Sequence, residues 1–170
     1  MKHIVVDLEM NNIRRRSEAR KICTNEIIEI GASMLDENLW EIGKFQIYVK
    51  PEYNDVIVPK ISKLTGITNE MVANAPDLST VMMHVCEFLG TEATIVGLQV
   101  QEFLAGFLCT AAQKTGAPLN VAIVLDLLHM AQALMEPKKG FRYRYIDILT
   151  RLDIATDTGI MGYVDMFNKL

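Results

Sequence analysis

The chain has 170 residues, a net charge of −4 and an apolar fraction of 50%. This composition suits a single folded domain over residues 1–170 and excludes a disordered chain. The acidic balance argues against a protein that coats nucleic acid with a generally basic surface. No apolar run approaches the roughly 20 residues that span a bilayer, and the opening MKHIVVDLEM is not a signal peptide. We therefore expect a cytoplasmic protein with no membrane partner.

Positive charge is concentrated in one segment, between Asn11 and Ile22, where a single acid, Glu18, offsets the basic residues. These are Arg14, Arg15, Arg16, Arg20 and Lys21. A basic loop on an acidic body is suited to local phosphate contact. An ordinary solvated loop explains the same residues equally well.

The N-terminal third of the chain predicts three strands joined in an antiparallel meander. Residues 3–10 alternate with apolar side chains on both faces, which is typical of a central strand covered on both sides. NEIIEIGASML, residues 25–35, predicts the second strand and KFQIYVKP, residues 44–51, the third. The intervening DENLWEIG predicts a turn.

The remainder of the chain predicts helices alternating with strands. A short helical turn is expected in ISKLTGIT and a helix in DLSTVMMHVCEFLG, capped by Asp77 or Ser79 and ended by Gly90. The later elements follow in order: a buried strand at 93–98, a helix at 101–115, a strand or turn that becomes a helix at 121–135, a helix at 143–152 and a closing helix from about Ile160. This order predicts a mixed α/β sheet flanked by helices.

Asp7 and Glu9 are the strongest local sign of chemistry. Two carboxylates two residues apart on a strand point to the same face, roughly 7 Å apart. A strand rich in Val and Ile is a costly place for two acids without a compensating cation. Hard oxygen ligands favour Mg²⁺ or Mn²⁺. The alternative is a strand end whose acids are simply exposed.

Four segments resemble, in order and spacing, the N-terminal half of the DEDDh 3′–5′ exonucleases, a family that includes ribonuclease T and polymerase proofreading subunits. They are VVDLEM, NEIIEIGASMLDE, FQIYVKPE and KLTGIT followed by EMV. The resemblance implies a ribonuclease-H-like fold with a mixed central sheet, and metal ligation by Asp7 and Glu9. It also implies that Met10 and the turn Leu64, Thr65, Gly66 and Ile67 contact the 3′-terminal nucleotide.

The second motif of the resembled family supplies an Asp at the start of a helix. Here the matching stretch is VGLQVQEF, which places Gln101 at the Asp position and Gly97 at a frequent Trp position. Glu102 is adjacent, but it points about 100° away on a helix. Ordinary first-turn residues would explain both side chains.

The third motif is a His followed five residues later by an Asp. Aligning the C-terminal segment makes Asp165 the last metal ligand and puts Ile160 at the general-base His. The sister subgroup has Tyr four before the Asp, where this chain has Met161. Tyr163 lies about 200° around the helix from Asp165, so we expect it to face elsewhere. His129 lies in an apolar stretch and is expected to be structural.

The resemblance thus implies a metal-dependent 3′–5′ exonuclease for single-stranded DNA or RNA ends, with impaired catalysis. Asp7, Glu9 and Asp165 are expected to converge on one Mg²⁺ or Mn²⁺ site, with the second site weakened by Gln101. The basic residues Arg14, Arg15 and Arg16 are expected to add nucleic-acid affinity. The alternative is a degenerate, non-catalytic member that binds a nucleic-acid end, a protein partner or a second copy of itself.

Overall fold

The computed structural model describes residues 2–13, 18, 24–90, 93–98, 105–135, 144–155 and 160–170. Its strands are β1 (His3–Asn12), β2 (Asn25–Leu35), β3 (Glu41–Tyr48), β4 (Ala93–Gly97) and β5 (Val121–Asp126). Its helices are α1 (Pro59–Thr65), α2 (Asn69–Ala73), α3 (Leu78–Leu89), α4 (Ala105–Thr115), α5 (Leu127–Leu134), α6 (Tyr145–Arg151) and α7 (Ile160–Lys169). The predicted elements are confirmed in order, and α2 is a short addition to them.

The strands form one five-stranded sheet in the order β3-β2-β1-β4-β5. β1 pairs antiparallel with β2, and β2 with β3, whereas β4 pairs parallel with β1 and β5 with β4. This is the predicted meander extended by parallel strands. β1 is central, which explains why it carries apolar side chains on both faces.

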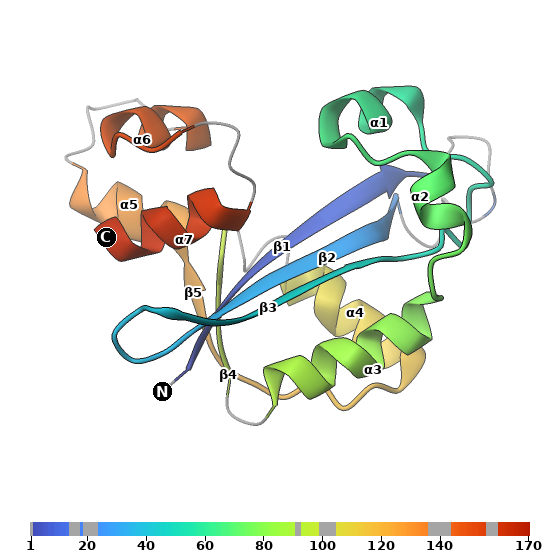
Figure 1. Ribbon diagram of the computed structural model, residues 1–170, viewed down its shortest axis with the longest axis horizontal. Coiled ribbons are helices and arrows are strands. Elements are labelled where there is room, and N and C mark those ends of the chain that lie inside the picture. Colours follow the sequence, from blue (N-terminus) through green and yellow to red (C-terminus); the bar gives the residue numbers. More distant parts are fainter. Residues whose placement is uncertain are drawn as a thin grey trace.

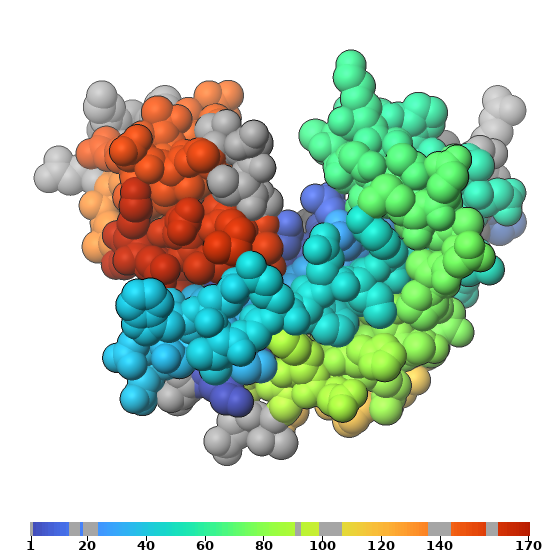
Figure 2. Space-filling model, viewed as in Figure 1, coloured from blue at the N-terminus to red at the C-terminus, as the bar shows by residue number. Residues whose placement is uncertain are grey.

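Helices cover the two faces of the sheet unequally (Figure 1). α3 and α4 pack on one face, against Ile4 and Val6 of β1. On the other face, α5, α6 and α7 cover one end around Val5, and α1 and α2 cover the opposite end around Ile28. The space-filling view shows the surface hollowed between α7 and the α1–α2 pair, with the strands at the bottom (Figure 2). We call this hollow the groove.

A side-chain cap and two glycines define the ends of α3 and the end of α1. The Asp77 side chain accepts a hydrogen bond from the Thr80 backbone N–H, which caps α3 as predicted. Gly90 ends that helix. Gly66 ends α1 with a left-handed φ of 76°, a conformation that favours glycine.

A buried polar network ties β1 and β2 to α1. Glu26 accepts hydrogen bonds from the side chains of Asn11 and Asn54 and from the backbone N–H groups of residues 52 and 53. The Asn11 side chain also accepts from the Val58 N–H, at the N-cap of α1. These bonds satisfy a buried carboxylate without a cation and fix the start of α1 relative to the end of β1.

Within the described ranges, no helix is long and apolar enough to cross a membrane.

Candidate active site

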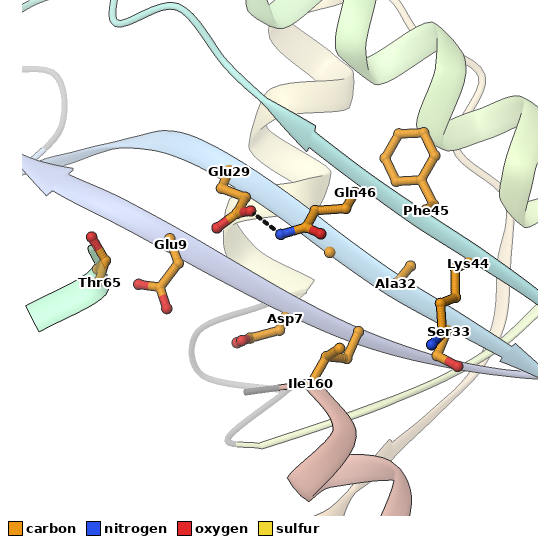
Figure 3. A pocket seen from close by; sticks show the side chains of 11 residues that line it. Asp7, Glu9, Glu29, Ala32, Ser33, Lys44, Phe45, Gln46, Thr65 and Ile160 are labelled. Atoms are coloured by element: carbon orange, nitrogen blue, oxygen red, sulfur yellow. Dashed lines mark hydrogen bonds between the residues drawn. The ribbon is translucent and has the colours of Figure 1, made fainter. Parts of the chain in front are cut away.

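The groove contains a pocket of about 260 Å³ whose floor is the β1–β2–β3 sheet. Its walls include Thr65 from α1 and Ile160 from α7. Figure 3 shows Glu9 and Thr65 at one end, Asp7 beside Ile160 in the middle, and Ser33 with Lys44 at the far end. The two carboxylates singled out from the sequence therefore share one concave surface.

Asp7 and Glu9 lie in an environment that disfavours their charged forms. Burial is the main cause that raises the pKa of Asp7, and the charge of Glu29 adds to it. Burial, followed by the negative charges of Asp7 and Glu29, raises the pKa of Glu9 to about 7. Asp7 is partly compensated by hydrogen bonds from the Leu8 N–H, at 3.0 Å, and from the Tyr163 hydroxyl. Among the described residues, no cation lowers either pKa.

Glu29 is a third carboxylate of the pocket that the sequence reasoning did not single out. It pairs directly with Glu9 across the β1–β2 ladder, so the two like charges share a face and destabilise each other. Gln46 of β3 donates a hydrogen bond to Glu29 at 2.5 Å. The sequence shows that Glu29 shares one strand face with Gly31 and Ser33, because these residues alternate with apolar ones. It does not show the strand register that brings Glu29 opposite Glu9.

The donor set fits a hard divalent cation. Two neighbouring carboxylates with raised pKa values form a site that lacks positive charge. Mg²⁺ commonly binds through one or two carboxylates and completes its shell with waters and substrate phosphate. Asp7 and Glu9 would hold it. Over the described part of the chain, no cluster of three His, Cys, Asp or Glu side chains could hold a metal ion, and the structure does not bring Asp165 together with Asp7 and Glu9.

The reason lies in the rotation of α7. Its inward side includes Ile160, Tyr163, Val164 and Phe167, which pack with the core around β1 at helical spacing. Asp165 falls on the opposite side and is exposed. Tyr163, expected to face away, instead donates its hydroxyl hydrogen to Asp7. Burial and the nearby Asp7 charge raise the pKa of Tyr163, so its phenol stays protonated.

The position of Ile160 matches its expected place beside the acids. Its Cδ1 atom lies 3.8 Å from a Cβ built on Gly31, and Gly31 pairs with Asp7. An apolar side chain therefore stands next to Asp7 where the resembled family has its base. His129 does not replace it, because its side chain is exposed on α5 and faces Asp126 at 3.8 Å.

The α1 wall meets the expectation for a nucleotide-binding turn in part. Thr65 lines the pocket, and the neighbouring Leu64 is 77% exposed. Ile67 is buried and anchors the turn. Met10 packs toward α3 and α4, on the face of β1 opposite the groove, because successive strand residues alternate. The structure therefore does not place Met10 where it was expected to contact the terminal nucleotide.

Two groups of predicted residues lie outside the described part of the chain. They are Gln101, at the second-motif position, and the basic residues Arg14, Arg15 and Arg16.

Comparison with known proteins gives a consistent family. The profile of the RNase T exonuclease family matches residues 4–158. The DNA polymerase III epsilon subunit of Pasteurella multocida is 31% identical over 118 residues, 67% of this chain and 45% of that protein. A PolC-type DNA polymerase III of Caldanaerobacter subterraneus is 28% identical over 139 residues, 82% of this chain and 9% of that protein.

A structural comparison agrees. Exonuclease I of E. coli, solved in complex with a 5cy-dA13 oligonucleotide, superposes with a TM-score of 0.75 over 99% of this chain and 40% of that one, at 14% identity. This likeness supports the fold. The chain spans less than half the length of each of these three proteins. With the family profile covering most of its length, the chain belongs to the RNase T exonuclease family.

Proposed function

We propose that this chain is a metal-dependent 3′–5′ exonuclease that acts slowly on single-stranded DNA or RNA ends. The observation that carries the proposal is the pairing of Asp7 and Glu9 on the groove floor, with pKa values raised by burial and by neighbouring negative charge. An acidic centre in a concave site within an exonuclease fold is suited to phosphodiester hydrolysis. The family match supports the reaction class.

Mg²⁺ or Mn²⁺ held by Asp7 and Glu9 would neutralise the acids and supply the positive charge that a developing phosphoryl oxyanion requires. The chain's own residues provide the remaining functions. Thr65 and the exposed Leu64 offer a polar and an apolar surface to a terminal sugar and base. Ile67 and the network around Glu26 hold that turn in place.

Slow turnover follows from the α7 wall. Ile160 cannot accept a proton from an attacking water, and the Tyr163 phenol is protonated and already donates to Asp7. A positioned general base contributes about 10²–10⁴-fold to such reactions. With no base on the described part of α7, we expect cleavage well below that of a complete site.

The same observation favours a second candidate function. If the missing base abolishes cleavage, the groove would bind a 3′ end without cutting it. The α1 wall and the acidic pair serve that role as well as they serve catalysis. Binding with no metal-stimulated cleavage distinguishes this candidate from the first.

The test is a nuclease assay on single-stranded DNA and RNA labelled at the 5′ end, with Mn²⁺ and with EDTA. We expect a Mn²⁺-dependent ladder that shortens from the 3′ end. Asp7→Asn should abolish it, whereas Asp165→Asn should not, because Asp165 is exposed away from the groove. Equal loss in both variants would contradict the proposed site, and no cleavage by the wild type would favour the binding role.

A further inference from the structure

The groove does not end at the acidic pair. Its floor continues from β1 across β2 to β3, and Ser33 of β2 and Lys44 of β3 line the same pocket. Figure 3 shows these two residues beyond Ile160, at the end of the pocket opposite Glu9 and Thr65. One continuous surface therefore joins the acids to a second polar cluster.

The second cluster is built to hold an anion. Ser33 is fully buried and donates its hydroxyl hydrogen to Glu41 at 2.7 Å, and Lys44 pairs with the same carboxylate at 3.1 Å. These two contacts lower the pKa of Glu41, with the Ser33 bond as the larger cause. The Glu41 carboxylate thus shows that negative charge is stabilised at this end of the groove.

Charge divides the pocket into two ends. Glu9 and Glu29 lie toward one end and Asp7 lies in the middle, whereas Lys44 is the cation among the described lining residues at the other end. The Lys44 side chain is 64% exposed, and an exposed ion pair contributes only about 0–1 kcal/mol. Since an ammonium group has three N–H donors, Lys44 can bind a second anion beside Glu41 or exchange Glu41 for it.

The spacing suits a nucleic-acid strand. Gln46 pairs with Gly31, and Gly31 with Asp7, while Lys44 lies two residues along β3. With strands about 4.8 Å apart and a rise of about 3.3 Å per residue, the Lys44 backbone is roughly 10 Å across the sheet and 7 Å along it from Asp7. At roughly 3.4 Å or more per nucleotide, this distance spans two to three nucleotides.

We propose that Lys44 forms a phosphate-binding subsite for the strand on the 5′ side of the bond at Asp7, with Ser33 holding the neighbouring Glu41 carboxylate in place. The proposal rests on the proposed function, which puts the terminal nucleotide against Thr65 and the scissile phosphate at Asp7. A strand laid along the floor from Thr65 then reaches Lys44 with an upstream phosphate.

The test measures binding in EDTA, where metal-dependent cleavage is absent, with fluorescent thymidine oligonucleotides from a mononucleotide to a decanucleotide. Lys44→Ala should leave mononucleotide affinity unchanged and weaken binding of trinucleotides and longer strands by about three- to tenfold. The slope of log K against log salt should fall by about 0.7 for the lost contact. Lys44→Arg should retain most of the affinity.

Lys114→Ala is the matched control, because Lys114 also pairs with a glutamate, Glu52, but on α4, which covers the other face of the sheet. Equal affinities for Lys44→Ala and Lys114→Ala on long strands would overturn the subsite and leave the proposed function standing. A uniform loss that includes the mononucleotide would overturn it as well. Wild-type protein that binds none of the oligonucleotides would overturn the subsite, whereas the Mn²⁺-dependent cleavage assay tests the proposed function separately.

Discussion

The two walls of the groove differ in what they retain. The α1 wall presents Thr65 to the pocket and an uncovered Leu64, held by a buried turn, as expected for a surface that receives a strand end. The α7 wall presents Ile160 and a hydrogen-bonded Tyr163 to Asp7, where catalysis would call for a base. Under the proposed function, recognition of an end and its cleavage depend on different elements.

The family profile divides at the same place. Its match to residues 4–158 includes the whole α1 wall and stops before α7 begins at Ile160. The wall that departs chemically is thus also the one that the family match does not reach.

The largest expected effect comes from rebuilding the α7 wall. Ile160→His would place an imidazole beside Asp7, and Gln101→Asp would add a carboxylate at the second-motif position. Together they should raise Mn²⁺-dependent cleavage by about 10²-fold or more, the contribution of a positioned base. Single-turnover rates on a labelled single strand measure this gain.

Each single variant should do little, because base and metal act as a unit. Asp165→His serves as a control that adds an imidazole to α7 on its exposed side. A folded double variant that binds Mn²⁺ but gains no activity would show that residues 101 and 160 do not limit the rate of cleavage.

The fold was predictable because its signals are local. The alternation of His3–Met10, the Asp77 cap and the helix end at Gly90 each follow from one element, and all three are confirmed. The parallel pairing of β4 with β1, and of β5 with β4, follows in turn, since a strand after a crossover helix pairs parallel within the same sheet.

The site was predictable only for the acids on one strand. Glu29 escaped because its partner depends on the β1–β2 register, which the long segment between these strands leaves open. The orientations predicted for Tyr163 and Asp165 are the reverse of those in the structure, because the prediction took the rotation of α7 from alignment to a motif. The apolar spacing of Ile160, Val164 and Phe167 gives the observed rotation, and it outweighs the motif because burial decides which side of a helix faces the core.

A smaller effect is expected from Tyr163→Phe, which sharpens what the α7 wall does to Asp7. The phenol occupies a lone pair of the carboxylate that a cation would use, and Phe retains the ring that packs edge-to-face against Tyr145 at 5.4 Å. Loss of the hydroxyl should therefore tighten Mn²⁺ binding by up to about tenfold, the scale of one hydrogen bond to a charged group. Calorimetric titration measures the change.

Tyr145→Phe is the matched control, since it removes a hydroxyl from the neighbouring ring and leaves the hydrogen bond from Tyr163 to Asp7 in place. Weaker Mn²⁺ binding in Tyr163→Phe would reverse the interpretation. The phenol would then orient Asp7 for the cation instead of competing with it.

The smallest expected effect is a change in the free energy of unfolding, and it arises from Glu9 on the groove floor. Folding raises the pKa of Glu9 from 4.5 to about 7, so the folded chain holds a proton that the unfolded chain releases between these values. The free energy of unfolding therefore falls as pH rises from 4.5 to 7, and the penalty is fully present above pH 7. Glu9→Gln removes the titrating group and should remove this penalty.

We expect Glu9→Gln to be more stable than the wild type above pH 7 by about 1 kcal/mol, a value reduced for the solvent screening of a half-exposed group. The difference should vanish below pH 4.5, where Glu9 is protonated in both states. Urea unfolding across this range measures it, with Glu37→Gln in the exposed β2–β3 turn as the control. Saturating Mn²⁺ should reverse the order, because a cation that binds only the folded wild-type site stabilises it. A stability difference that is constant with pH would show that Glu9 carries no such penalty, and the floor of the groove would then lack the uncompensated charge on which a metal site depends.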